Sequence, residues 1–482
     1  MSIDFFINAI SPIDGRYYEK TKELKDFFSE KSLFSYRIYV ETQYLIKLIE
    51  TRELNIRKIT DKEKEILENL HKISDEDCRI IKEIETKGYK EIPATNHDVK
   101  AVEYFIKLKL DESSLKDIKE FVHFALTSED INNIAYGLII RDSINEKIFP
   151  LLIDCYAKIY EISIKYKDLP MLARTHGQPA SPTTFGKEML VFVKRLKDEF
   201  LNLYNQTILL KLNGATGNFN AHNICYPEID WIEFSKDFIF SFEKEKKTIQ
   251  NEHYSKLPLK VDFNLVTTQI EPHDSYCRIF DSFKRINTIL IDFCMDIWRY
   301  ISDGWLKQKA IKGEIGSSAM PHKVNPIDFE NAEGNLGVAN SLFNFFSSKL
   351  MISRLQRDLS DSTVLRNIGA AFAYSFLAYK SIIKGLSKIE VDQKKILEEL
   401  NNTPEILAEA YQNVLRKIGF DKPYELLKEI TRGKKIALDD FHNLIKNLNI
   451  DNETKNRLLS LKPFDYIGLA SRIVEKFDKF IQ

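Results

Sequence analysis

Glycine and proline are scarce in this chain, whose 482 residues include only 17 glycines and 14 prolines. A protein built from many short strands needs these residues at its turns, so their scarcity argues against a β-rich fold and favours long helices. Cysteine is also rare, and no C-x-x-C pair occurs. Such a dispersed, odd-numbered set excludes a disulfide framework and indicates reduced thiols in a cytoplasmic protein. The five are Cys78, Cys155, Cys225, Cys277 and Cys294.

An excess of charge of either sign is absent as well. Seventy basic residues face 71 acidic ones, for a formal net charge of −1. No overall field therefore draws the protein to nucleic acid or an anionic membrane, although a local basic pocket for an anion stays compatible with this balance. No apolar run approaches the ~18 residues of a membrane span, and the N-terminal stretch lacks the pattern of a signal peptide. We expect a cytoplasmic protein with no nucleic-acid or membrane partner.

What the sequence has in abundance is helical periodicity. Between residues 279 and 300, apolar side chains recur at alternating steps of four and three residues, and 189–203 and 365–389 follow a similar spacing. A seam of this kind belongs to a helix packed along its length against near-parallel neighbours. The pattern predicts an all-α fold with a central bundle of long helices.

The chain is longer than one typical domain, and its segments change in character along the sequence. Short helical patterns precede the long seams, and short segments separated by turns such as "GFDKP" and "LKPFD" follow them. We predict an N-terminal helical domain at 1–120, a central long-helix bundle at 121–390 and a small C-terminal helical domain at 391–482. The segments 87–94 and 243–260 look like insertions.

One connection interrupts the helical pattern: "KGEIGSSAMPHKVNP", residues 312–326, holds two glycines, two serines and two prolines. Polar groups also gather at 11–18, 95–105, 120–133, 173–189 and 357–367. Each segment alone has a plain structural explanation, because Thr127 to Asp130 suit a helix cap and isolated arginines often form surface ion pairs.

Several familiar chemistries lack their sequence signals. The histidines show no H-E-x-x-H spacing, so a metal site is disfavoured. Glycine-rich nucleotide cradles are missing, and so is the G-x-S-x-G elbow of a serine hydrolase. We therefore expect a site that uses neither a metal nor an organic cofactor.

Taken together, the polar segments resemble the motifs of the fumarase/aspartase superfamily. "GSSAMPHKVNP" is similar to its signature loop, G-S-S-x-M-P-x-K-x-N-P. "RTHGQPA", "TSEDINN", "TTQIEPHD" and "QRDLSDSTVLRN" look like further motifs of the superfamily, in the expected order. The resemblance extends from "SPIDGRY" to near "YIGLASRIV". His322 and Lys323, followed by "IDFENAEGNLG", resemble the members that act on a succinylated purine nucleotide.

The resemblance implies cleavage of a C–N bond by β-elimination, with release of fumarate. This chemistry needs a base for a weakly acidic C–H proton, donors that stabilise a carboxylate-derived carbanion, and an acid for the leaving nitrogen. A serine can be the base only as an alkoxide held by N–H groups and a nearby cation, in a loop that closes and expels water. By motif match that base is Ser317, and its choice over Ser318 rests on the resemblance. His176 is the candidate acid, because imidazole titrates near neutrality.

The remaining candidate residues are expected to bind the substrate. Lys323 suits a substrate carboxylate and Asn325 can donate to another, while guanidinium groups suit the phosphate. The phosphate is expected among Arg16, Tyr17, Arg357, Ser362, Thr363 and Arg366. By resemblance, the residues that line the rest of the site are Asn96, His97, Asp98, Thr127, Ser128, Gln269 and Asn331.

Two alternatives remain open. Argininosuccinate lyase or aspartase activity is possible within the superfamily, because fold alone does not choose the substrate; His322 and the phosphate-suited arginines argue against both. A structural protein that kept the fold without the activity is the second alternative. A decayed site would normally lose its loop residues, and here Ser317, His176 and Lys323 are all present.

The resemblance also implies a homotetramer in which each active site is assembled from three chains. Its central helices would then form one large bundle, which the long apolar seams fit. One departure concerns "FNLVTTQ", which lacks the Pro-Tyr expected before the threonines. It puts in doubt the shape of the wall around Gln269.

Overall fold

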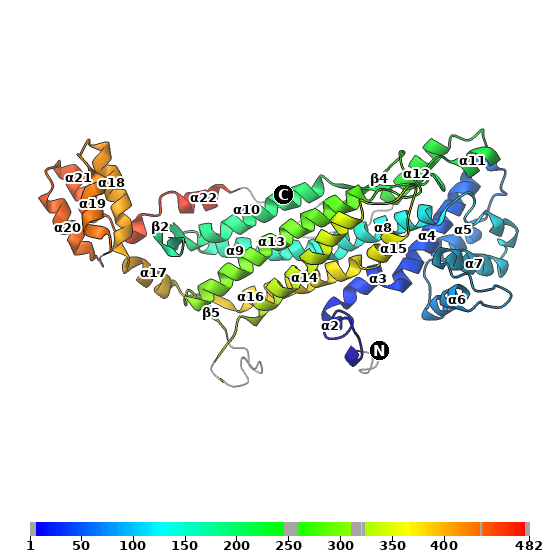
Figure 1. Cartoon of the computed structure of the whole chain (residues 1–482), viewed down its shortest axis with the longest axis horizontal. Coiled ribbons are helices and arrows are strands. Elements are labelled where there is room, and N and C mark those ends of the chain that lie inside the picture. The colour runs from blue at the N-terminus through cyan, green and yellow to red at the C-terminus, as the bar shows by residue number, and fades with distance from the viewer. Residues whose placement is uncertain (1–5, 245–258, 310–319, 321–322, 434–435, 478–482) are drawn as a thin grey trace.

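The protein is a long bundle of helices with a smaller group of helices at each end (Figure 1). The computed structural model describes residues 6–244, 259–309, 320, 323–433 and 436–477. Ser317 and His322, which belong to the predicted signature loop, lie outside this part of the chain. None of the helices described has a stretch long and apolar enough to cross a lipid bilayer.

The bundle consists chiefly of five long helices, and they confirm the predicted seams. α13 (Asp274–Ser302) and α14 (Ile327–Lys349) run side by side, and α16 (Ile368–Lys388) packs against α14. α9 (Phe149–Lys165) and α10 (Phe185–Tyr204) pack against each other and complete the bundle.

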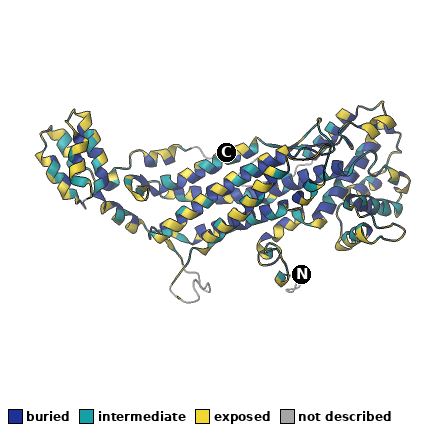
Figure 2. Ribbon diagram, in the orientation of Figure 1, coloured by how far each residue is buried: buried dark blue, intermediate teal, exposed yellow. Residues whose placement is uncertain are grey.

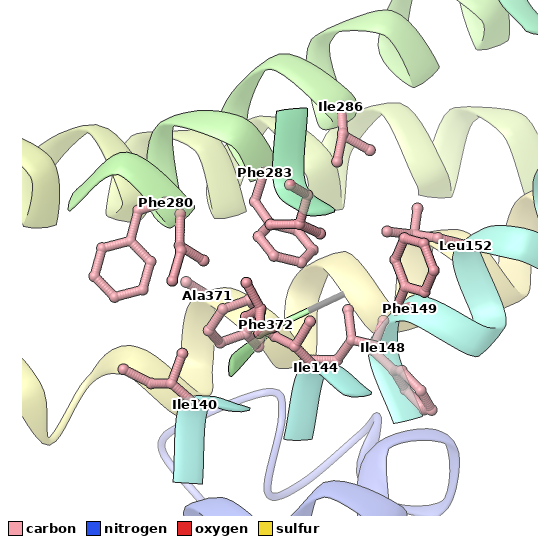
Figure 3. Close-up of a cluster of buried hydrophobic side chains, with 14 of the residues drawn as sticks. Ile140, Ile144, Ile148, Phe149, Leu152, Phe280, Phe283, Ile286, Ala371 and Phe372 are labelled. Carbon is pink, nitrogen blue, oxygen red and sulfur yellow. The ribbon is translucent and has the colours of Figure 1, made fainter. Parts of the chain in front are cut away.

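Aromatic rings from distant parts of the sequence fill the bundle's centre (Figure 3). Phe283 of α13 meets Phe372 of α16 edge to face, with ring centroids 5.1 Å apart. Both side chains are completely buried. Replacing such a ring by alanine costs about 3–5 kcal/mol, so this layer is a main source of the bundle's stability.

Three small sheets occur among the described residues, and the sequence predicted none of them. β1 (Pro170–Thr175) and β2 (Gln178–Thr184) form an antiparallel hairpin, and β3 (Thr207–Leu210) pairs in parallel with β4 (Lys260–Phe263). β5 (Leu306–Gln308) pairs with β6 (Ile389–Val391) in antiparallel fashion. Strands this short join helices and leave no alternating apolar pattern of useful length.

The group of helices near the N-terminus shares one helix with the bundle. α4 (Glu30–Glu50) places Val40, Tyr44 and Leu48 in the bundle core, and it places Ile38 and Leu45 in a second apolar core. Figure 2 shows buried residues both along the bundle and in the group of helices near the N-terminus. The other helices in the first third of the chain are α2 (Tyr18–Thr21), α3 (Lys25–Phe28), α5 (Asp61–Asn69), α6 (Asp75–Thr86), α7 (Asp98–Asp111) and α8 (Ser128–Ser143).

A third apolar core lies near the C-terminus, around Tyr411 and Phe441. These three cores suit the division at 1–120, 121–390 and 391–482, which we retain as a proposal because α4 contributes to two of them. The remaining helices are α11 (Asn220–Cys225), α12 (Trp231–Lys244), α15 (Ser360–Leu365), α17 (Gln393–Asn401), α18 (Leu407–Lys417), α19 (Pro423–Thr431), α20 (Leu438–Asn447), α21 (Asn452–Ser460) and α22 (Ala470–Lys476).

Candidate active site

Asp98, the first residue of α7, joins two arginines from distant parts of the chain. Its Oδ2 accepts hydrogen bonds from Arg37 on α4 at 2.9 Å and from Arg366, just after α15, at 2.7 Å. Burial opposes the ionised form of Asp98, but the two guanidinium groups outweigh it and lower the pKa of Asp98 to about 2. Asp98 is therefore a fixed carboxylate that holds Arg366 in place.

His97 caps α7 and faces the start of α8. Its Nδ1 accepts from the Lys100 N–H at 3.3 Å, and its Nε2 lies 3.4 Å from the Ser128 hydroxyl. His97 is the N-cap residue of α7, although asparagine and aspartate are commoner caps and Asn96 and Asp98 flank it. Asn96 is exposed, with a left-handed φ of 47°. The hydrogen bond from the Lys100 N–H thus orients the His97 ring, and the other ring nitrogen faces Ser128.

Thr127 and Ser128 begin α8, as the capping interpretation predicted. The Thr127 N–H donates to Asp130 at 2.9 Å. Asp130 is buried and pairs with the buried Lys211 at 3.0 Å, while its Oδ1 also accepts from the Asn213 N–H at 3.1 Å. A buried ion pair with satisfied donors fixes the turn. Residues predicted to bind the substrate therefore also form the start of this helix.

Arg357 is the centre of a second group of contacts. Its Nη2 lies 3.0 Å from Glu129 Oε2 and 4.0 Å from Asp361 Oδ1. Its Nη1 donates to Gln269 Oε1 at 3.4 Å, and the Gln269 amide in turn donates to the Ala215 carbonyl at 3.1 Å. The hydrogen bond from Arg357 thereby orients the Gln269 side chain.

Three buried titratable groups surround this arginine: Glu129, His273 and Asp361. Burial raises the pKa of Glu129 to about 7 although Arg357 opposes the shift, and burial also raises the pKa of Asp361. Burial and the nearby Arg357 lower the pKa of His273 to about 4, so its ring is neutral. Neither ring nitrogen of His273 makes a hydrogen bond of normal geometry with the described residues. The backbone of Leu350 opposes the lowering of the His273 pKa without reversing it.

The same three side chains were not singled out from the sequence. In the sequence Glu129 has the position of a cap residue, and His273 and Asp361 lie within "TTQIEPHD" and "DLSDS". Their ligand atoms lie within 4.8 Å of one another, which is close enough for a metal ion in the described part of the chain. Arg357 already supplies a positive charge against Glu129, so these residues fit a guanidinium better than a metal ion.

Other predicted residues lie on neighbouring elements of the same chain. Ser362 and Thr363 are in α15, and the Ser362 N–H donates to Asp361 at 2.7 Å. Arg16 is exposed in the turn before α2, which packs against α16, and Tyr17 precedes the helix directly. Asn331 lies apart from these residues, near the start of α14, where its Oδ1 accepts from the Ser381 hydroxyl of α16 at 2.9 Å.

His176 lies far from these groups. It occupies the exposed turn between β1 and β2, with a left-handed φ of 53°. Figure 1 shows this hairpin beside the C-terminal helices, at the opposite end of the bundle from α7, α8 and α15. The hairpin is tied there by Arg174 to Glu399 and by Ser181 to Glu409. A single chain therefore does not bring the candidate acid to the substrate-binding residues.

Lys323 and Asn325 lie in a third place, just before α14. The Lys323 N–H donates to the Met320 carbonyl at 3.0 Å, and Gln308, the last residue of β5, donates to the Val324 carbonyl at 2.9 Å. These contacts hold the segment beside β5, away from α7 and α8 (Figure 1). The candidate residues thus fall into separate groups along one elongated chain.

The long-helix bundle, with candidate polar groups in separate places along it, agrees with the class of helical lyases that the motifs predict. The model of a family described as "Lyase" matches residues 15–340, and one described as "Adenylosuccinate lyase C-terminal" matches residues 353–467. The chain belongs to the adenylosuccinate lyase family. Figure 1 shows that the two matched regions together span the bundle and both ends of the molecule.

Relatives of this chain agree over almost its whole length. It is 47% identical to the adenylosuccinate lyase of Haemophilus influenzae, covering 98% of each chain. It is 45% identical to the adenylosuccinate lyase of Escherichia coli K12, again covering 98% of each.

Solved structures with far lower identity share the fold. A fumarate lyase from a Mesorhizobium species is 15% identical with a TM-score of 0.71, covering 94% of this chain and 96% of the other. The 3-carboxy-cis,cis-muconate lactonizing enzyme from Pseudomonas putida is 18% identical with a TM-score of 0.67 and the same coverage. These two support the all-helical bundle architecture alone.

Proposed function

We propose that this chain catalyses β-elimination of fumarate from adenylosuccinate, giving AMP, as a step of purine nucleotide biosynthesis. The observation that carries the proposal is the near-half identity with curated adenylosuccinate lyases across almost the full length of both chains. The same chemistry on succinyl-aminoimidazole-carboxamide ribotide (SAICAR) would give AICAR. The two substrates share the succinyl group, the scissile C–N bond and the phosphate.

The proposed roles divide the reaction between separate parts of the chain. Ser317 removes the C–H proton, and the electron pair left on carbon expels the nitrogen as fumarate forms. His176 gives a proton to that nitrogen. Lys323 and Asn325 stabilise the charge that develops on the substrate carboxylate. The roles of these four residues come from the motif match, and no metal or organic cofactor is needed for them.

Arg366 supports phosphate binding at the end of the bundle that carries α7, α8 and α15. Arg366 is partly exposed and donates to Asp98 through one nitrogen. A guanidinium has five N–H donors, so the others can face a phosphate. Arg16, Tyr17, Ser362 and Thr363 would complete this part of the site. Asn96, His97, Thr127, Ser128, Gln269 and Asn331 would hold the remainder of the substrate.

The separation of these groups supports active sites shared between chains, and the resemblance to the superfamily supports a homotetramer. Because the β1–β2 hairpin and α8 lie at opposite ends of the bundle, His176 can meet Ser128 only if the two come from different chains. Large apolar side chains remain exposed on the bundle, among them Met295 and Trp298 of α13 and Phe345 of α14. A surface of this kind suits coverage by other copies of the chain. The dispersed free cysteines keep the cytoplasm as the proposed location.

The decisive experiment is a turnover assay with the purified protein. We expect release of fumarate and AMP from adenylosuccinate, followed by absorbance and chromatography. Argininosuccinate and aspartate should give no fumarate under the same conditions. Turnover of either of these without turnover of adenylosuccinate would overturn the proposal.

A further inference from the structure

The group around Arg357 has more acidic than basic side chains. Glu129 and Asp361 are both buried, and both approach the same nitrogen of Arg357, at 3.0 and 4.0 Å. Glu129 Oε1 and Asp361 Oδ2 have no hydrogen-bond partner. One guanidinium therefore faces two buried carboxylates, each with an oxygen that still lacks a donor. Buried polar atoms without partners are rare in folded proteins and call for a physical explanation.

Other charges near the pair do not neutralise it. Lys211 influences Glu129, but its ammonium group is committed to Asp130 at 3.0 Å. Asp358, three residues before Asp361, adds a further negative charge near it. Tyr136 and Tyr276 face Glu129 from α8 and α13, and burial keeps both phenols protonated by raising their pKa. His273 is neutral and contributes no charge.

We propose that Glu129 and Asp361 bind one shared proton when an anionic ligand engages Arg357, and that this buried pair with His273 is the positioning unit that holds Arg357 and Gln269. The proton comes from solvent and goes to one of the two unpartnered carboxylate oxygens. The new O–H group then donates within the cluster, to the other carboxylate or to a ring nitrogen of His273. No covalent bond forms or breaks.

The direction of the coupling follows from electrostatics. A nucleotide phosphate beside Arg357 adds negative charge near the carboxylates, and a like charge raises a carboxyl pKa. The pKa of Glu129 is already about 7 in the free chain, so a further rise takes up protons near neutral pH. Binding should therefore be accompanied by proton uptake, and the positive charge of Arg357 becomes available to the ligand as one carboxylate is neutralised.

The inference rests on the proposed function, and titration calorimetry with AMP tests it on the intact oligomer. Heats measured in Tris and in HEPES at about pH 7.5 give the number of protons exchanged. At that pH the AMP phosphate is nearly fully ionised and has little proton left to release, and contact with arginines disfavours its protonation, so it contributes few protons to the count. We expect the wild-type protein to take up on the order of half a proton per AMP.

Three variants separate the cluster from the rest of the protein. Glu129→Gln and Asp361→Asn should each remove most of the uptake and weaken AMP binding. Asp296→Asn is the matched control, because burial raises the pKa of Asp296 to about 6 beside Asp292 and Glu188, which are not part of the cluster. It should leave the proton count unchanged.

The outcomes distinguish the two proposals. AMP binding with no proton uptake by the wild-type protein would overturn the shared proton, whether or not either cluster variant folds. Uptake that persists in both cluster variants, or that disappears in Asp296→Asn, would also overturn it. Failure of the wild-type protein to bind AMP at all would instead remove the proposed function, and this inference with it.

Discussion

Asp98 and Arg366 pair at 2.7 Å although 268 residues of sequence separate them. The pair joins the region that matches the lyase family to the region that matches the C-terminal family. Arg37 holds the same carboxylate from α4 at 2.9 Å. The Asp98 carboxylate thus links α7, α4 and the segment after α15. It also fixes the orientation of the Arg366 guanidinium, which is partly exposed.

Replacing Asp98 by asparagine should weaken both the fold and phosphate binding. The two arginines hold the pKa of Asp98 at about 2, against an ordinary value near 4, and a difference of this size corresponds to about 2 kcal/mol. Because the pKa is lowered, this stability is present above about pH 4 and is lost as the pH falls toward 2. Urea unfolding at about pH 7 and at about pH 2.5 should show a smaller gap between variant and wild type at the acid pH.

Asp111→Asn is the matched control for this experiment, because Asp111 ends the same helix and pairs with Lys119 at 2.7 Å near the surface. Its cost should stay within about 1 kcal/mol, as for most surface pairs. The KM for adenylosuccinate should rise about tenfold in Asp98→Asn, a loss of about 1.4 kcal/mol in binding, and remain unchanged in Asp111→Asn. Equal effects of the two variants would contradict a special role for Asp98.

Ser317→Ala and His176→Ala should each reduce turnover by a factor of about a thousand or more, while the oligomer and the fold persist. A mixture of the two variants should recover part of the activity after subunit exchange, because some sites then combine an intact serine with an intact histidine. Fumarate release before and after exchange is the measurement.

Ser318→Ala is the control for the choice between the adjacent serines, and it should keep far more activity than Ser317→Ala. The reverse order of the two serine variants would transfer the proposed role of base to Ser318. An exchanged mixture of Ser317→Ala and His176→Ala that stays inactive would argue against active sites shared between chains.

The sequence predicts the long helices well, because alternating steps of three and four residues persist over several turns. Ile279, Phe283, Ile286, Leu290, Phe293 and Ile297 are all completely buried in α13. The sequence does not predict that α4 serves two cores, since a helix that is apolar on two sides has no single seam. Strands as short as β5, which has three residues, also cannot be predicted from alternation of apolar and polar residues, because that pattern needs a longer run.

The candidate site is only partly predictable for a different reason. Motifs place His97, Ser128 and Arg366 in a site, and the structure brings the elements that carry them together. Glu129 and Asp361 could not be singled out, because an acidic residue near a helix start is usually a cap. Only the fold reveals that both are buried against Arg357.

A buried ion pair supports the strained segment before Ser128. His123 Nδ1 lies 2.5 Å from Glu41 Oε1, and both His123 and Ala125 have left-handed φ angles, 61° and 58°. Burial disfavours the charged imidazole, but Glu41 outweighs it and raises the pKa of His123 above its ordinary 6.5. Stability from this pair is therefore complete below about pH 6.5 and is lost as the pH rises through the raised pKa.

Glu41→Gln should accordingly cost about 3 kcal/mol of unfolding free energy at pH 6 and clearly less at pH 9. Glu120→Gln is the control, because Glu120 lies just before this segment and pairs with Lys107 at 2.9 Å while largely exposed. Its effect should be under about 1 kcal/mol at both pH values. A cost for Glu41→Gln that grows with pH would contradict the charged state assigned to His123.

Gly186 lies where α9 and α10 meet too closely for any side chain. A Cβ there would lie 2.3 Å from the Ser163 carbonyl oxygen and 2.5 Å from the Lys167 Cα, both backbone atoms that cannot turn aside. The glycine N–H also donates to the Tyr166 carbonyl at 2.9 Å, so the contact has to open if a methyl group is added. Gly186→Ala should lower the free energy of unfolding by about 2–3 kcal/mol.

Gly334 is the opposite case on α14, because a Cβ there meets nothing within 4 Å of its own chain. Alanine is the better helix former by about 1 kcal/mol, so Gly334→Ala should stabilise a chain whose α14 is open to solvent on that side. Thermal unfolding of both variants, with light scattering at each step, measures the contrast. If Gly334→Ala instead lowers stability and dissociates the oligomer, that face of α14 is covered by another copy, because only a closely packed neighbour can turn an added methyl group into a clash.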